Sequence, residues 1–380
     1  MKITAYQNRQ VLILSLALGL IFFGFNAAEQ HFTAFYQLTG RQNLAFQALA
    51  ILYGAIVVGN LIGPSIVRLI GIKSSLFLGY LAYVALVFGI VTKIPFLVYL
   101  LSALLGIGAG ISGIARIDFL RLIAPVNQRG EYAGAPESLR TFGGFLGVVS
   151  VSLFLQFLNI DQTFILLGAV MLLGVGLMLF LKEVPLDDSL SSVSSLGVMV
   201  RYMVDPKILL LLPSGLAAGF LLGLVLGAIP AAISQNFGIE WVGIITSLFH
   251  LTLALILVTA GYWSDLKGRF IFIYGGMIVS ILAVTIFLNF LTLPALILVM
   301  ILLGLGGSLG GGAFSALMLD TFEKRVKEAS ATLNNLTIIL GIVPAFLLPQ
   351  FLNRNELFNL GIILTLLGIL TLFIFQKLYD

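Results

Sequence analysis

The stretch VLILSLALGLIFFGF, residues 11–25, is apolar in every position except Ser15. The apolar run continues to about residue 36, which is long enough for a helix to cross a hydrocarbon layer of about 30 Å. It is too long for the core of a signal peptide, and it lacks a small-residue cleavage site. Strands of a membrane barrel would alternate apolar and polar residues, and this stretch does not. It therefore predicts a membrane-spanning helix.

Similar runs recur along nearly all of the 380 residues, of which 60% are hydrophobic and only 9% charged. A soluble domain carries roughly a quarter of its residues as charges. Charged or turn-rich breaks separate the runs, so the sequence predicts an all-α integral membrane protein with twelve transmembrane helices. The expected spans are residues 10–36, 45–70, 74–92, 95–123, 137–159, 161–182, 206–235, 240–263, 270–290, 293–319, 329–352 and 357–378.

The distribution of basic residues predicts the orientation. If the N-terminus is cytoplasmic, the outer loops hold only Arg41, Lys93 and Arg354, and the other 17 of the 20 Lys and Arg lie inside. Cytoplasmic loops of membrane proteins carry this excess, so we expect both termini in the cytoplasm. The same rule explains the net charge of +4 without nucleic-acid binding. There is no cysteine, which excludes disulfides and thiolate metal sites.

A long polar connection between spans six and seven divides the chain into two halves. We expect an N-terminal six-helix bundle over residues 1–182, a cytoplasmic linker over 183–205 and a C-terminal six-helix bundle over 206–380.

The halves also match each other in sequence. Leu104–Gly108 in span four corresponds to Leu302–Gly306 in span ten at an offset of 198, and Gly63 corresponds to Gly261 at the same offset. Two parallel repeats imply a pseudo-two-fold axis along the membrane normal, with a binding site near the midplane.

Loop motifs add a resemblance to a known family. After span eight, GYWSDLKGR at residues 261–269 resembles the Gly-x-x-x-Asp-Arg/Lys-x-Gly-Arg signature of the major facilitator superfamily. Asp265 and Arg269 stand at the acidic and the final basic positions, and the other basic residue is displaced by one position. The equivalent loop after span two keeps Arg68 but has Val67 where the acid belongs.

Two further stretches are similar to this superfamily. Residues 124–130, APVNQRG, resemble its Pro-x-x-x-Arg-Gly signature, in which Arg129 is the basic residue. Residues 48–65 are similar to its Unc-ninety-three-like branch. The arginine that many coupled members carry before the span-four glycine motif is absent here, where Ala103 stands, so this route of coupling has no support.

The resemblance implies a secondary active transporter that moves a small solute by alternating access, with spans 1, 4, 7 and 10 lining the cavity. We also expect a monomer in the plasma (inner) membrane, in contact with lipid, with no cofactor and no enzymatic activity. The resemblance also implies that Asp265 braces the first turn of span five, where Arg140 could add a hydrogen bond. The alternative is a non-transporting regulatory or escort protein of the same fold.

Ionisable residues at membrane depth are costly, so each is a functional hypothesis. In span one, Asn26, Glu29 and Gln30 follow i, i+3, i+4 spacing and share one helix face, with His31 beside them. Glu29 could carry a coupling proton or bind a cationic group. Alternatively, Glu29 and His31 belong to a hydrated helix end near the outer interface.

Other candidates lie in spans four and eight. Arg116 could hold an anionic substrate, because guanidinium pairs bidentately with carboxylate or phosphate. Alternatively, Arg116 and Arg121 extend to the inner interface or pair with Asp118. His250 could relay protons or form one hydrogen bond to a neighbouring helix.

The remaining patterns favour structural roles. The glycine runs at residues 106–113 and 304–312 lie within spans and follow no strand, so they predict close helix packing rather than nucleotide binding. Pro213, Pro230, Pro344 and Pro349 are expected to bend their helices. The sequence holds no Walker loop, metal cluster or catalytic triad.

Overall fold

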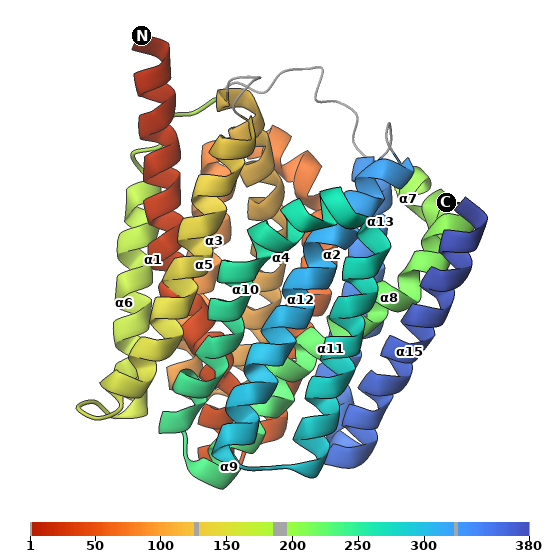
Figure 1. Ribbon diagram of the computed structural model, residues 1–380. Coiled ribbons are helices and arrows are strands. Elements are labelled where there is room, and N and C mark those ends of the chain that lie inside the picture. The colour runs from red at the N-terminus through yellow and green to blue at the C-terminus, as the bar shows by residue number, and fades with distance from the viewer. Residues whose placement is uncertain (1, 125–128, 185–195, 323–325, 380) are drawn as a thin grey trace. The chain divides into compact units, whose positions relative to one another are not determined.

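The computed structural model describes residues 2–124, 129–184, 196–322 and 326–379. Within these ranges the chain contains helices and turns but no strand (Figure 1). Eleven helices in the described part are long and apolar enough to cross a membrane. Helix α5 (Arg129–Phe154) supplies the twelfth span, and its first turns carry the charged residues Glu137 and Arg140. The prediction of twelve transmembrane helices is confirmed.

The chain forms two compact units. Unit 1 comprises residues 1–193 and 233–244, and unit 2 comprises residues 194–232 and 245–380. The spans of unit 1 are α1 (Lys2–Leu38), α2 (Gln42–Ile70), α3 (Ile72–Thr92), α4 (Pro95–Ile123), α5 and α6 (Ile160–Met178).

The second half of the chain begins with a short helix, α7 (Leu196–Met203), within the region expected to be a polar linker. Span seven consists of α8, the π-helix η3 and α9, and span eleven of α13, the π-helix η5, α14 and the 3₁₀-helix η6. The bounds are α8 (Pro206–Gly223), η3 (Leu224–Ala228), α9 (Ile229–Phe237), α10 (Glu240–Lys267), α11 (Arg269–Asn289), α12 (Leu293–Phe322), α13 (Val326–Thr337), η5 (Ile338–Ile342), α14 (Val343–Leu347), η6 (Leu348–Gln350) and α15 (Arg354–Tyr379).

Several helices begin earlier than their apolar runs. The first was expected from residue 10 but starts at Lys2, and the fifth was expected from residue 137 but starts at Arg129. A helix can continue beyond the hydrocarbon layer, where polar residues are hydrated, so hydropathy detects only its apolar part. The fifth helix also ends earlier, at Phe154, because a turn precedes Asn159, which caps α6.

Close glycine contacts recur at equivalent places in the two halves. A Cβ atom on Gly108 of α4 would lie 2.9 Å from the carbonyl oxygen of Gly79 in α3. The equivalent helices show the same approach, because a Cβ on Gly276 of α11 would lie 2.6 Å from the carbonyl oxygen of Gly306 in α12. Such distances leave no room for a side chain. The prediction that the glycine runs serve close helix packing is confirmed for the first part of each run, whereas Gly113, Gly310 and Gly311 have nothing within 4 Å of the position that a Cβ would take.

The two halves also have the same kind of helix cap at equivalent positions, at the starts of α6 and α15. Asn159 and Gln162 form a capping box at the start of α6, in which each side chain bonds the backbone N–H of the other residue. Asn353 and Glu356 form the same arrangement at the start of α15, with distances of 2.9 and 3.0 Å. A capping box satisfies N–H groups that a helix end would otherwise leave without a partner. Spans six and twelve therefore begin alike.

Two of the four singled-out prolines lie next to π-helical turns. Pro230 follows η3 by two residues, and Pro344 follows η5 by two residues. Proline has no N–H, and its ring clashes with the carbonyl group four residues earlier, so the regular hydrogen-bond ladder is interrupted there. A π-turn accommodates the mismatch, as it commonly does where helices are irregular.

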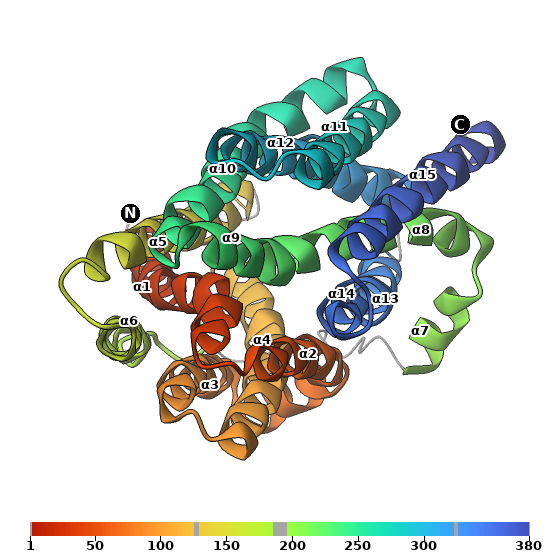
Figure 2. The ribbon, with the colours of Figure 1, turned by 90° about the horizontal axis from the view of Figure 1, so that it is seen from below.

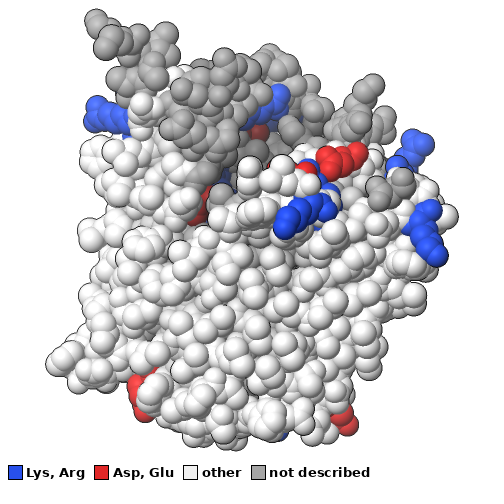
Figure 3. All heavy atoms as spheres, viewed as in Figure 1, with Lys and Arg blue, Asp and Glu red and all other residues white. Residues whose placement is uncertain are grey.

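Large apolar side chains cover the outward surface of the helices. Examples are Leu69, Leu173 and Ile278, which are exposed although they are apolar. On the face drawn in Figure 3, most charged atoms lie towards the helix ends and the band between them is largely uncharged. Exposed apolar surface of this extent matches contact with lipid.

Helix α1 is the centre of the packing in unit 1. It contacts α2, α3, α5 and α6, and the end-on view in Figure 2 shows α5 and α6 running close beside it. On α5, glycines at positions 143 and 147 face the backbone of α1 at Gly19 and Phe23. This small-xxx-small spacing lets two helix backbones approach closely. It also brings the polar residues of α5 next to α1.

We expect Gly147→Ala to lower the stability of the protein by about 1–3 kcal/mol, because the new Cβ would overlap the carbonyl oxygen of Phe23 and force the helices apart. The matched control is Gly176→Ala in α6, where nothing lies within 4 Å of the position that a Cβ would take. That change gains helix propensity and should be neutral or stabilising. Thermal unfolding of the purified variants measures both effects. Equal melting temperatures for the two variants would contradict this packing.

Candidate functional site

Glu29 lies in the middle of unit 1 rather than at an exposed helix end. Only 7% of the surface of Glu29 is exposed, and α1 continues for about two more turns to Leu38. The Tyr53 hydroxyl of α2 donates a hydrogen bond to Glu29 Oε1 at 2.9 Å. Arg140 of α5 lies near enough to interact with the carboxylate electrostatically. Glu29 is thus enclosed by protein, and its partners come from two other helices.

A small pocket adjoins Glu29 between α1, α2 and α3. Its volume is about 210 Å³, which includes space open to the surroundings. All of its lining residues other than Glu29 are apolar: Phe25, Ala28, Phe32, Leu49, Leu52, Leu86, Val87 and Ile90. Glu29 is therefore the only residue lining this pocket whose side chain can accept or release a proton.

The other polar residues of span one point to different neighbours. His31 is fully buried, and its Nδ1 donates a hydrogen bond to the Ala27 carbonyl oxygen at 2.8 Å. The His31 ring also adjoins Gly243, and its Nε2 has no hydrogen-bond partner within the described residues. Gln30 is fully buried, and Asn26 lies against Gly144 of α5. The shared helix face is therefore divided between contacts with α2 and with α5.

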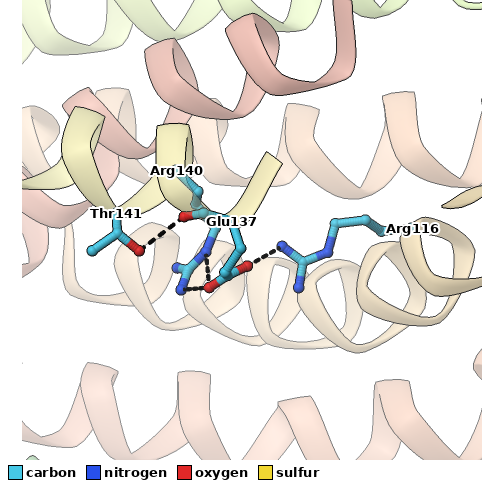
Figure 4. A network of polar contacts seen from close by, with 4 residues as sticks. All are labelled: Arg116, Glu137, Arg140 and Thr141. Atoms are coloured by element: carbon cyan, nitrogen blue, oxygen red, sulfur yellow. Dashed lines mark hydrogen bonds and ion pairs between the residues drawn. The ribbon is translucent and has the colours of Figure 1, made fainter. Parts of the chain in front are cut away.

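Arg116 of α4 and Arg140 of α5 meet at one carboxylate, that of Glu137 (Figure 4). Arg116 Nη1 lies 3.0 Å from Glu137 Oε2, and Arg140 Nε lies 2.8 Å from Glu137 Oε1. Arg140 Nη2 also contacts Oε1, so this guanidinium uses two donors on one oxygen. The Thr141 hydroxyl donates to the Glu137 backbone carbonyl at 2.9 Å. The network joins α4 to α5.

An aromatic cluster borders this network. The Arg140 guanidinium lies 4.7 Å from the ring centroid of Phe22, a cation–π contact. Phe22 packs against Tyr80 and Tyr83 of α3 at centroid distances of 6.3 and 5.7 Å. Tyr83 packs edge-on against Phe25 at 4.6 Å. The cluster extends from the arginines towards Glu29.

The remaining candidates occupy helix ends or unit 2. Asp118 is half-buried on α4, Arg68 is exposed in the last turn of α2, and the side chain of Arg129 lies outside the described residues. His250 packs edge-on against Phe249 in α10, with ring centroids 5.2 Å apart.

The loop signature after α10 forms its own ion-pair cluster. Arg269 pairs with Asp265 four residues earlier, and its Nε lies 3.2 Å from Asp320 Oδ2 of α12. Arg269 Nη1 also donates to the Ser264 hydroxyl at 3.3 Å. Asp265 is thus bonded within unit 2, and Arg140 is bonded to Glu137 within unit 1. All hydrogen bonds that the structure describes for Asp265 and for Arg140 are made to residues of the same unit.

Two residues of this site did not stand out in the sequence. Glu137 falls at the expected boundary of span five, where a charged residue is ordinary, although its i, i+3 spacing to Arg140 signals a pair within the helix. Tyr53 lies in an apolar run, and only the fold shows that its hydroxyl reaches Glu29.

The chemistry available is ionic binding and proton exchange. Among the described residues, no group of three or more His, Asp or Glu side chains is arranged to hold a metal ion. The site offers a protonatable carboxylate, two guanidinium groups and tyrosine hydroxyls, which suit the recognition of a polar or charged solute.

Comparisons with known proteins agree with the fold. The profile of the Major Facilitator Superfamily matches residues 11–342. Two UNC93-like MFSD11 proteins, from Xenopus tropicalis and Xenopus laevis, are each 29% identical to this chain over 150 residues. These matches cover 38% of this chain and only 34% of each relative. They support the likeness to the Unc-ninety-three-like branch over that stretch.

Solved transporter structures share the fold over nearly the whole chain. The nucleoside transporter NupG superposes with a TM-score of 0.73 at 13% identity, covering 98% of this chain and 99% of that one. A D-xylose-proton symporter gives 0.73 at 16% identity, covering 96% of both chains. These helices, glycine contacts and matches lead to one conclusion: the chain is an integral membrane protein of the Major Facilitator Superfamily, a family of transporters rather than enzymes.

Proposed function

We propose that the protein is a secondary active transporter that moves a small solute by alternating access, coupled to protons through Glu29. The observation that carries this proposal is the buried pair of Glu29 and Tyr53. A carboxylate enclosed by apolar residues at membrane depth is expensive, and such groups commonly serve ion or proton pathways. A purely structural helix contact could be made by apolar side chains at lower cost.

Glu29 has the surroundings that a proton carrier needs. Tyr53 can donate to the ionised carboxylate, and Arg140 favours its negative charge. The apolar pocket wall disfavours that charge. These opposing influences let a change of surroundings during the transport cycle load or release the proton.

We further propose that both termini are cytoplasmic, that the protein acts as a monomer, and that it resides in the plasma (inner) membrane. The Asp265, Arg269 and Asp320 cluster would then lie at the cytoplasmic ends of α10, α11 and α12. We assign it to the cytoplasmic gate, together with Arg68 and Arg129. Exposed ion pairs are worth only about 0–1 kcal/mol each, so they can break and reform as the gate moves.

The topology can be tested with single cysteines, because the chain has none of its own. Thr39 follows α1 at an exposed position. Ser189 falls in the expected cytoplasmic linker and lies outside the described residues. An impermeant thiol reagent added outside should label Thr39→Cys in whole cells and spare Ser189→Cys until the cells are broken. The reverse pattern would overturn the orientation.

Proton coupling requires a transported solute, which a thermal-stabilisation screen of purified protein can identify, since a ligand that binds the folded state raises its melting temperature. Uptake of that solute into proteoliposomes should then depend on an imposed pH gradient. In Glu29→Gln, which keeps the shape and removes the charge, uptake should lose this dependence. Tyr53→Phe should keep the dependence but slow uptake by about tenfold or less, because one hydrogen bond to a carboxylate is lost.

The matched control is Tyr274→Phe, which removes a tyrosine hydrogen bond to Gln376 in unit 2 and should leave coupling intact. Undiminished pH-gradient dependence in Glu29→Gln would rule out Glu29 as the coupling group. A protein that no solute stabilises and that moves none would favour the escort or regulatory role instead.

A further inference from the structure

The three side chains of Arg116, Glu137 and Arg140 together carry more positive than negative charge. Arg116 lies seven residues before the end of α4, and Arg140 lies eleven residues after the start of α5. At 1.5 Å per residue these positions are roughly 10 and 16 Å from the helix ends. Two guanidinium groups share one carboxylate, which leaves a net charge of one. Arg140 also lies within electrostatic reach of Glu29, which offsets part of this charge when it is ionised.

Within the described residues, the two arginines also have unused hydrogen-bond donors. Each guanidinium has five N–H groups. Arg116 uses one on Glu137 and Arg140 uses two, and the described residues supply no further acceptor to either side chain. The side chains of Arg116 and Arg140 are 25% and 28% exposed, and that of Glu137 is 45% exposed. The carboxylate is therefore the most accessible member of the cluster and can be displaced.

An apolar, aromatic surface borders the charges. Phe22 packs under the Arg140 guanidinium, and Tyr80 and Tyr83 are near enough to interact with the charges of both arginines. An inorganic anion would gain nothing from such a wall. The apolar body of an organic anion could pack against it while its charged group meets the guanidinium groups.

We propose that Arg116 and Arg140 form the binding site for the carboxylate of an organic monoanion, and that Glu137 occupies this site until the solute displaces it from Arg116. The excess charge of one fits a monoanion, and a planar carboxylate fits a guanidinium through two parallel hydrogen bonds. This inference names the substrate class for the transporter proposed above and rests on that function.

Ligand-induced thermal stabilisation of the purified full-length protein tests the proposal without transport. The probes are benzoate and phenylacetate, each compared with its uncharged amide, benzamide or phenylacetamide. We expect the carboxylates to raise the melting temperature and the amides to leave it unchanged. Arg116→Gln should weaken carboxylate binding roughly tenfold, because a charge-assisted bidentate contact is lost.

The variant Glu137→Gln tests whether Glu137 is a counterion that the solute displaces or a residue that only holds α4 and α5 together. If Glu137 competes with the solute, its neutral replacement should bind the carboxylates several-fold more tightly than the native protein, a gain that misfolding cannot produce. Lys93→Gln is the control, since it removes another ion pair of unit 1, with Asp161, and should change nothing.

The proposal is overturned if carboxylates stabilise neither the native protein nor Glu137→Gln more than their amides do. It is also overturned if Arg116→Gln binds them as tightly as the native protein, or if Glu137→Gln binds them no more tightly. Carboxylate binding without any transport would overturn only the transport function. Transport of a solute whose binding is unaffected by changes at Arg116, Glu137 and Arg140 would overturn only the substrate class.

Discussion

The fold depends on how closely its helix backbones can approach one another. Lipid tails are as apolar as leucine, so the hydrophobic effect does not press membrane helices together, and packing must do so. The glycines at positions 79, 106 and 108 bring α4 against α2 and α3, and those at 276, 304 and 306 repeat the arrangement for α10, α11 and α12. The glycines of α5 at 143, 144 and 147 do the same against α1. Polar groups of different spans can meet only because of these approaches.

The approach of α5 to α1 determines the chemistry of unit 1. It places Arg140 over Phe22 and within electrostatic reach of Glu29. A bulkier residue at position 147 would move the guanidinium away from both. The glycine at this position therefore also sets the distance between the groups proposed to bind the anion and the proton. Packing and the proposed function would use the same contact.

The sequence was sufficient for the fold but only in part for the site. Continuous apolar runs indicated the twelve spans, because the hydrocarbon thickness fixes their length, and the glycine registers indicated the repeat. Glu29 and Arg116 stood out because charges at depth are rare. Glu137 and Tyr53 did not, since a glutamate at a span boundary and a tyrosine in an apolar run are ordinary. Their importance comes from which helices pack together. No one-dimensional pattern encodes that Tyr53 of α2 faces Glu29 of α1.

The charges of unit 1 connect the two proposals. With Glu29 ionised, the carboxylates of Glu29 and Glu137 balance the two arginines. A bound monoanion adds one negative charge, and a proton on Glu29 removes one, so the balance is restored when both bind. Since ionised Glu29 offsets part of the charge of Arg140, its protonation strengthens the attraction for the anion. By linkage, the bound anion must favour binding of the proton to the same degree.

The empty protein and the protein that holds both anion and proton then carry the same net charge at membrane depth, whereas a protein that holds only one of them (a singly loaded form) carries an excess. The excess charge would make the singly loaded forms the costly ones to reorient, and this cost would couple the proposed movements of anion and proton.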